Sequence, residues 1–321
     1  YRCSYKTRNW TDYSRKRDTK PPGGGTGESK PPQPDATKYS WMTGNVVSNE
    51  TSRNLTALGP NVIPDRVGIT YTFVDYYNSL TGDWKSSVGY QIGDFLIECS
   101  IGDRYCSQRD FTRFMHPLYG NCYTFNAASN GTEPFMVQQT GPLHGLTVTL
   151  FIDQTEYVGA VANSAGVSVV VHETNKQPFP EDSGISVSPG QETYIGLKQF
   201  FTQRLAAPYS DDCQNNYEEA NQLNNMYAVQ SNYSLPNVNY SQSACMKTCI
   251  QRQVEKRCNC SSPNLPISNP AIDPLYNSSY SICLYEYNST LSTISDNAKC
   301  MTKVEQAAFK YCLANCKKDC E

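Results

Sequence analysis

The C-terminal cysteines place the strongest constraint on how this chain folds. Cys245 and Cys249 are four residues apart, so they share one face of a helix, and the same holds for Cys312 and Cys316. Facing residues of two antiparallel helices have numbers with a constant sum, and Cys245 with Cys316 and Cys249 with Cys312 give the same sum. We therefore predict two antiparallel helices joined by these two disulfides.

Helical periodicity extends on both sides of these cysteines. One helix is expected over about Ser243–Lys256. A second helix, capped by Asp296, is expected to run to about Asn315. One face of the second helix carries small or apolar side chains, namely Met301, Val304, Ala308, Cys312 and Cys316. This face is predicted to pack on the first helix.

The chain has 321 residues and fourteen cysteines, an even number that suits an exported protein with all thiols paired. Cys320 lies one turn beyond the second helix, and Cys213 remains upstream as its partner. Cys99 and Cys106 bracket a short turn and are expected to pair. Four more cysteines close the far end of the helix pair, and spacing leaves their pairing open: Cys258, Cys260, Cys283 and Cys300.

Elimination leaves Cys3 as the partner of Cys122. A structural zinc site is the competing interpretation of so many cysteines. The chain has no CxxC pair and only three histidines, so we expect no metal.

Nine Asn-x-Ser/Thr sequons also indicate an extracellular protein. Asn259 lies between two cysteines and is a poor acceptor. The expected glycosylation sites are Asn9, Asn49, Asn54, Asn130, Asn232, Asn239, Asn277 and Asn288. No run of about 18 apolar residues occurs, so we expect no membrane span in this sequence and interpret it as part of a longer protein.

Several function classes are disfavoured by the sequence. The net charge is −3 and no basic stripe with interleaved aromatics occurs, so nucleic acid is not an expected partner. The sequence lacks GxSxG, HExxH and P-loop motifs, so we expect neither an enzyme nor a cofactor.

The order of local patterns indicates an α+β fold. Residues 18–38 are rich in Pro and Gly and almost free of hydrophobes, which predicts a flexible loop. Aromatic-rich residues 61–97 predict short helices, the last running into Cys99. From Tyr119 to about Leu205 the pattern is β, with alternation in two runs: Leu146, Val148, Leu150, Ile152, and Val167, Val169, Val171. Helical periodicity follows Cys213.

Several motifs resemble the degenerin/epithelial sodium channel/acid-sensing ion channel family, the amiloride-sensitive sodium channel superfamily. The most specific is Tyr119–Asn126 (YGNCYTFN), and Phe95–Cys99 (FLIEC) precedes it. Further matches follow in order: Cys106, Phe111, Gly145-Leu146, Val171-His172, Pro178–Pro180, Pro189-Gly190, Arg204-Leu205, Tyr240-Ser241, Cys258–Cys260 and Pro266. The resemblance covers about Asp94 to Cys320.

This resemblance implies a central β palm with β-ball and knuckle, a helical finger, and a disulfide-stapled antiparallel helical thumb. Residues 1–118 map to the finger region, with residue 3 at the end of a palm strand, residues 119–212 to the palm, knuckle and β-ball, and residues 213–321 to the thumb. The membrane helices and outermost palm strands would lie outside this sequence. For the four cysteines left open, we predict Cys258–Cys300 and Cys260–Cys283.

The resemblance also implies a function. The chain would be the extracellular gating domain of a trimeric, sodium-selective, amiloride-sensitive channel in the plasma membrane, assembled with two further subunits. A peptide, protons or force would be the stimulus. The alternative is a secreted, disulfide-rich binding or adhesion module without a pore.

Candidate functional residues follow from these expectations, each with a structural alternative. The resemblance implies that Tyr209, after Pro208, couples the thumb to a membrane helix; otherwise it is a core tyrosine. Candidate sensing residues are His172, His144, Glu181, Asp182, Asp211 and Asp212. Solvated turn acids, and a strand-end His172 that holds a carbonyl, are the alternatives. Tyr71, Phe73, Tyr76, Tyr77 and Trp84 line a peptide groove or fill the finger core.

Overall fold

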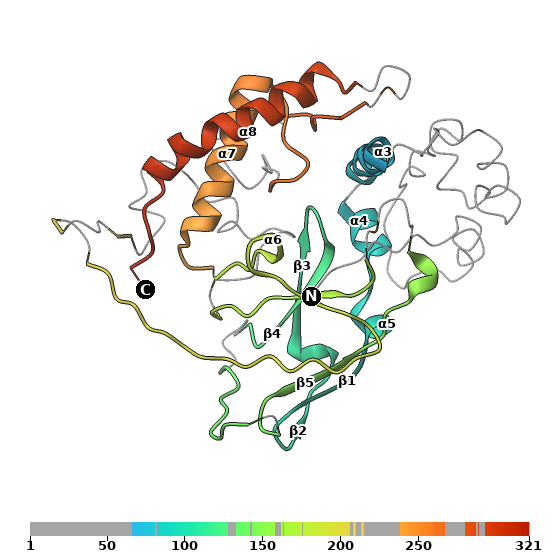
Figure 1. Ribbon diagram of the computed structural model, residues 1–321, viewed down its shortest axis with the longest axis vertical. Helices are drawn as coiled ribbons and strands as arrows, with labels where there is room; N and C mark the ends of the chain where they lie inside the picture. The colour runs from blue at the N-terminus through green and yellow to red at the C-terminus, as the bar shows by residue number, and fades with distance from the viewer. Residues whose placement is uncertain are drawn as a thin grey trace, which may run out of the picture.

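The computed structural model describes residues 66–80, 82–127, 133–141, 143–157, 162, 164–174, 176–205, 208–209, 213–214, 238–266, 280–286, 288 and 293–320. In these ranges the fold is α+β, with antiparallel β pairs and two long helices, α7 (Gln242–Cys258) and α8 (Asp296–Asn315). Figure 1 shows α7 and α8 side by side along one edge of the molecule, with the strands below them.

The aromatic-rich segment forms three helices: α3 (Arg66–Ser79), α4 (Gly82–Val88) and α5 (Ile92–Phe95). Phe73 and Tyr77 lie four residues apart on one face of α3 and form a buried cluster with Leu80. This cluster is the local core that fixes the end of α3.

The change from helix to strand comes earlier than the sequence indicated. The last short helix was expected to run into Cys99, but α5 ends at Phe95 and strand β1 (Leu96–Ile101) follows. Ile97 is exposed in β1 while Cys99 is buried, so β1 has no clean hydrophobic alternation. Its extended state depends on pairing with β5 (Leu146–Leu150), about fifty residues away, which no local pattern reveals.

Strands β1 and β5 form a sheet with β2 (Arg104–Tyr105), in the order β2-β1-β5. All pairings are antiparallel, with Cys99 opposite Val148 in the β1–β5 pair. The Cys99–Cys106 disulfide closes the turn between β1 and β2. The sequence predicted both this bridge and a strand at Leu146.

The YGNCYTF motif lies in a hairpin made of β3 (Phe111–His116) and β4 (Gly120–Phe125). Gly120 has φ of 71°, a conformation that glycine adopts without strain, at the turn that begins β4. A second pair, β6 (Val167–Val169) and β7 (Ile185–Val187), is antiparallel, and the short helix α6 (Pro180–Ser183) precedes β7.

Each helix of the long pair begins at a serine. The Ser241 hydroxyl accepts a hydrogen bond from the Ala244 amide at the start of α7. At α8 the cap is Ser295, whose hydroxyl accepts from Ala298, and not Asp296 as predicted. Serine and aspartate cap helices about equally well, and Asp296 instead occupies the first turn, where its carboxylate faces the positive end of the helix dipole.

Disulfides join α7 and α8 along their length. Cys245 is bonded to Cys316 and Cys249 to Cys312, the two pairs given by the constant-sum argument. Three further bridges enclose or extend this pair: Cys213–Cys320, Cys258–Cys300 and Cys260–Cys283. Cys122 is disulfide-bonded as well, and Cys3, its predicted partner, lies outside the described residues. The five C-terminal bridges are nested, each inside the one before it.

The interface between the helices is closely packed. Met301, Val304 and Ala308 of α8 are buried together with Cys312 and Cys316, which is the face expected from periodicity. The buried Gln251 side chain ties α7 to the segment that follows it: its Nε2 donates to the Ser262 carbonyl at 3.1 Å and its Oε1 accepts from the Ser262 main-chain amide at 2.9 Å. The helix pair is therefore a stiff unit.

Candidate functional site at the base of the helix pair

The segment that leaves α8, residues 316–320, is held from several directions, and we call it the C-terminal strap. The Tyr240 hydroxyl donates to the Lys317 carbonyl at 2.6 Å, and the main-chain amide of Gln214 donates to the Lys318 carbonyl at 2.9 Å. The Arg204 amide donates to the Cys320 carbonyl at 2.8 Å, and its guanidinium donates to the Asp319 carbonyl at 2.9 Å. The base of α8 is thus tied to three separate parts of the chain.

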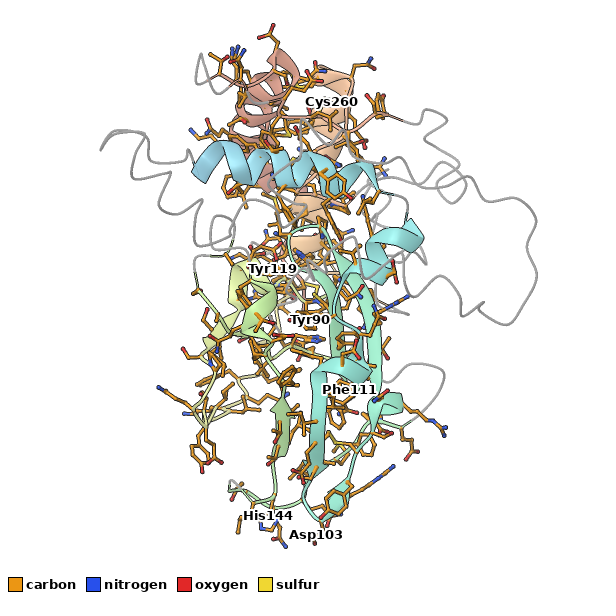
Figure 2. All side chains as sticks on the ribbon, turned by 90° about the vertical axis from the view of Figure 1, so that its right-hand side faces the viewer. Tyr90, Asp103, Phe111, Tyr119, His144 and Cys260 are labelled. Carbon is orange, nitrogen blue, oxygen red and sulfur yellow. A yellow bond between two sulfur atoms is a disulfide. The ribbon has the colours of Figure 1, made fainter. Side chains whose placement is uncertain are left out.

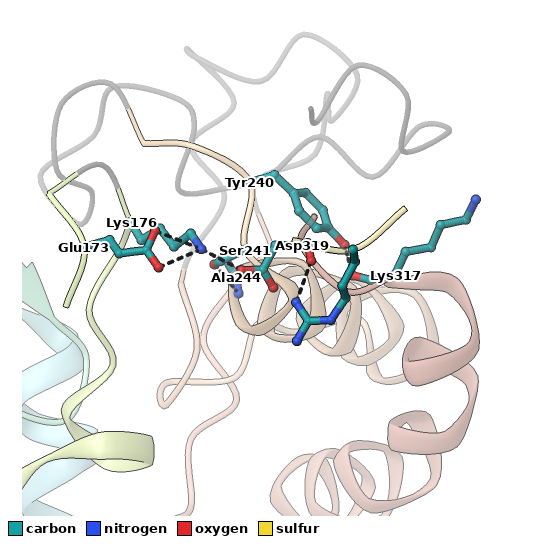
Figure 3. Close-up of polar contacts among 8 residues, drawn as sticks. Glu173, Lys176, Tyr240, Ser241, Ala244, Lys317 and Asp319 are labelled. Atoms are coloured by element: carbon teal, nitrogen blue, oxygen red, sulfur yellow. Dashed lines mark hydrogen bonds and ion pairs between the residues drawn. The ribbon is translucent and has the colours of Figure 1, made fainter. Parts of the chain in front are cut away.

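An ion-pair cluster links the strap to the loop after β6 (Figure 3). The Lys176 ammonium lies 2.6 Å from the Asp319 carboxylate and 3.0 Å from that of Glu173. Burial acts to lower the pKa of Lys176, but the hydrogen bonds to Asp319 and Glu173 outweigh it, so the pKa is raised. The Lys176 side chain is only 18% exposed, so solvent screens this pair less than an ordinary surface pair.

A second cluster joins β3, α6 and α7. His116 is buried and its Nε2 lies 3.0 Å from a Glu181 oxygen, while its Nδ1 accepts from the Leu118 amide at 3.2 Å. Because Nδ1 is an acceptor, Nε2 carries the hydrogen donated to Glu181. The Lys247 ammonium of α7 lies 2.8 Å from the other Glu181 oxygen and 3.2 Å from Asp182. The lysine thus docks α7 on α6.

The electrostatics of Glu181 follow from these contacts. Burial acts to raise the pKa of this carboxyl, but His116 and Lys247 together outweigh it and lower the pKa to about 2. Glu181 is therefore ionised throughout the physiological range. Of the six candidate sensing residues, Glu181 and Asp182 are the two that meet at this cluster.

The other candidate sensing residues lie elsewhere. The His172 Nδ1 donates to the Glu173 carbonyl at 2.8 Å, and burial lowers the pKa of this imidazole. Figure 2 shows His144 beside Asp103 at the end of the molecule opposite Cys260. Asp211 and Asp212 lie outside the described residues.

Tyr209, the candidate coupling residue, is 60% exposed. It follows Pro208 in the segment between Arg204 and Cys213, both of which contact or bond to the strap. Tyr209 is therefore exposed to solvent and lies four residues before Cys213, which is bonded to the strap.

The aromatic residues of α3 do not form an open surface together. Phe73 and Tyr77 are buried, and Tyr76 packs against their cluster. Tyr71 instead stacks on Tyr285, with ring centroids 4.1 Å apart. Trp84 lies in α4, and its side chain is outside the described set.

Asp75 links α3 to the segment that precedes α8. Its carboxylate, 6% exposed, accepts from the Tyr285 amide at 2.8 Å and the Glu286 amide at 2.9 Å. The Tyr285 hydroxyl accepts from the Asn264 amide at 3.1 Å. Asp75 therefore anchors α3 to the loop before α8.

Apart from Glu181 and Asp182, the residues that make these contacts were not predicted from the sequence. The candidate residues named from the sequence did not include Lys176, Asp319, Lys247, Asp75 or His116. The β pattern that begins at Tyr119 was the one available signal, because a hairpin partner for that strand would place His116 at the end of a strand before Pro117. The contacts Lys176–Asp319, Lys247–Glu181 and Asp75–Tyr285 join residues that are far apart in the chain.

Two of the predicted glycosylation sites can be located. Asn239 and Asn288 are exposed, whereas Asn9, Asn49, Asn54, Asn130, Asn232 and Asn277 lie outside the described residues. Among the residues described, no cluster of three or more His, Cys, Asp or Glu side chains could hold a metal ion. Within the same ranges, no helix has the length and apolar character needed to cross a membrane.

Comparison with known proteins gives consistent matches. The family described as "Amiloride-sensitive sodium channel" matches residues 9–321. The epithelial sodium channel subunit gamma-2 of Xenopus laevis is 34% identical over 187 residues, 58% of this chain and 26% of that protein. The subunit gamma of Xenopus laevis is 32% identical over 66% of this chain and 30% of its own length.

The subunit alpha of Neoceratodus forsteri is 30% identical over 235 residues, 72% of this chain and 32% of that protein. The chain thus spans about a quarter to a third of the length of these relatives.

Proposed function

Because this chain belongs to the amiloride-sensitive sodium channel family, we propose that it is the extracellular gating domain of a sodium-selective channel subunit. It would lie on the outer side of the plasma membrane and assemble with two further subunits as a trimer. The relatives named above are channel subunits, which supports assembly from several chains. Sodium would be the permeant ion of the whole protein, and amiloride its blocker.

The observation that carries this proposal is the stiff helix pair tied down at its base. A lever needs rigidity along its length and a defined contact at its foot. Two disulfides and a buried interface give α7 and α8 their rigidity. The C-terminal strap, through the ion pair between Lys176 and Asp319, provides the fixed contact at the base of the helix pair.

In the terms of the family, α7 and α8 would be the thumb, and α3 and α4 part of the finger. The β pairs between residues 96 and 187 would supply palm, knuckle and β-ball. The anchoring of α3 by Asp75 would then be a finger–thumb contact. Exposed Tyr209 would meet a membrane helix and carry thumb movement to the pore.

A stimulus acts in this scheme by favouring one arrangement of the thumb over another, and protons or a peptide do so by binding that arrangement more tightly. Protons, a peptide or force remain the candidate stimuli, and Glu181 with Asp182 on Lys247 is a charged contact that such a shift would break or make. The alternative, a secreted binding module without a pore, gains no support from the family match.

The test is an electrical recording from the full-length protein in oocytes. We expect a sodium current that amiloride blocks. Reversing one charge, Lys176→Asp or Asp319→Lys, should change the fraction of time the channel is open, and the double reversal should restore it. Lys299→Asp is the matched control, because Lys299 is 55% exposed and its partner Asp296 is fully solvated.

Surface labelling of the same cells separates gating from folding. Wild-type protein that reaches the surface and carries no amiloride-sensitive current with any of the three stimuli would contradict the channel assignment. If Lys176→Asp and Asp319→Lys each reach the surface at normal density and open for the same fraction of time as the wild type, the role of the Lys176–Asp319 ion pair is contradicted. The channel assignment would not be affected by that result.

A further inference from the structure

The sequon Asn239-Tyr240-Ser241 lies directly before α7, and its three residues have different environments. Asn239 is exposed, whereas Tyr240 is 2% and Ser241 8% exposed. The acceptor asparagine can therefore be reached from solvent in the folded protein. The hydroxyl that completes the sequon cannot.

Both buried residues have structural roles, drawn in Figure 3. The Tyr240 hydroxyl donates to the Lys317 carbonyl, and the Ser241 hydroxyl accepts from the Ala244 amide at 3.3 Å as the cap of α7. One turn further on, Cys245 is bonded to Cys316. Closing the helix pair thus withdraws the sequon from any enzyme that must bind it in extended form.

N-glycosylation needs that extended form, because the transferase binds the Ser or Thr hydroxyl together with the asparagine. The Asn239 Nδ2 atom bonds to the anomeric carbon of an oligosaccharide supplied on a lipid diphosphate. The bond from that carbon to the phosphate oxygen breaks, the lipid diphosphate leaves with the electron pair, and the amide releases one proton. The exposed position of Asn239 lets the finished fold accommodate the attached glycan.

We propose that Asn239 is an N-glycosylation site that accepts its glycan only before α7 and α8 close. Cys316 is synthesised 71 residues after Cys245, so the open period lasts at least about 4–14 s at a synthesis rate of about 5–20 residues per second. Occupancy is then set by competition between glycan transfer and formation of the Cys245–Cys316 bridge. The inference rests on the extracellular location in the proposed function.

The experiment expresses the full-length protein in secretory cells with and without brief dithiothreitol treatment during synthesis. Glycopeptide mass spectrometry measures occupancy at Asn239, with exposed Asn288 as the internal reference. Delayed disulfide formation should raise Asn239 occupancy by about twofold or more, because oxidation takes seconds to hours. Ser241→Asp keeps a capping residue and destroys the sequon, so it should fold and carry no glycan at Asn239.

The outcomes are distinct. Glycan at Asn288 with none at Asn239 in either condition would overturn the site. Complete occupancy of Asn239 in both conditions would overturn the competition with folding. Absence of glycan from every sequon would instead refute the extracellular location, and with it the premise of this inference.

Discussion

Asp75 provides the sharpest test of how the helix pair is held against the rest of the fold. Asp75→Ala removes the acceptor of two main-chain amides, those of Tyr285, a residue only 6% exposed, and Glu286. A hydrogen bond to a charged group contributes about 1.5–3 kcal/mol, and a buried donor left without acceptor costs about 1–3 kcal/mol. We therefore expect a loss of about 3 kcal/mol in the free energy of unfolding.

Such a loss corresponds to a fall in Tm of about 6–12 °C for a domain of this size. Asp75→Asn keeps one acceptor oxygen and places an NH2 group against the other amide, so it should lose about half as much. Thermal unfolding by circular dichroism gives Tm, and hydrogen exchange reports the two amides individually. Exchange should accelerate at Tyr285 and Glu286 in Asp75→Ala.

The control is Asp296→Asn, since the Asp296 side chain is 97% exposed and the change should cost less than about 0.5 kcal/mol. If Asp75→Ala unfolds at the wild-type Tm and the Tyr285 and Glu286 amides exchange at wild-type rates, the anchoring of α3 by this carboxylate is refuted.

Three further predictions concern pH and the disulfides. Burial acts to raise the pKa of Glu181, but His116 and Lys247 outweigh it and lower the pKa from an ordinary value of 4.5 to about 2. The stability contributed by this carboxylate is therefore complete above pH 4.5 and is lost as the pH falls toward 2. Glu181→Gln should lower the urea midpoint at pH 7, and the midpoint of this variant should decrease less than that of the wild type as the pH falls below 4.5. Burial lowers the pKa of Lys85 to about 8 from 10.5. Between these pH values the unfolded state binds more protons than the folded state, so the free energy of unfolding should rise with pH over that window. If the urea midpoint of Lys85→Met rises with pH as it does in the wild type, Lys85 is not the source of the rise. An isolated bridge closing a loop of 63 residues would contribute about 4 kcal/mol to the free energy of unfolding. Because Cys245–Cys316 already closes nearly the same loop, replacing Cys249 and Cys312 by alanine should lower that free energy by less than this amount. Guanidinium unfolding should show that removing both bridges costs more than the sum of the two single removals, and simple additivity would count against this nested arrangement.

The helix pair could be predicted from the sequence because its information is local and periodic. Cysteines at spacing four fix both a helix face and, through the constant sum, the partner of each residue. The sheets were harder. β1 has an exposed Ile97 beside a buried Cys99, so only its partner β5 identifies it as a strand.

The candidate site was the least predictable part of the protein. Asp75 meets Tyr285 across 210 residues, and Lys176 meets Asp319 across 143. The positions of single lysines and aspartates in the sequence do not predict which distant residues they pair with, because these contacts form only after the helix pair and the sheets have packed. The family motifs located the chain in its superfamily without indicating these particular contacts.

The nesting of the five C-terminal bridges has a consequence for proteases. A cut in the peptide chain between residues 261 and 282 separates two pieces that five disulfides still span. The clipped protein would keep its mobility on a non-reducing gel and release two fragments only after reduction. Backbone cleavage there alters the covalent connectivity of the domain while leaving the two helices fastened together.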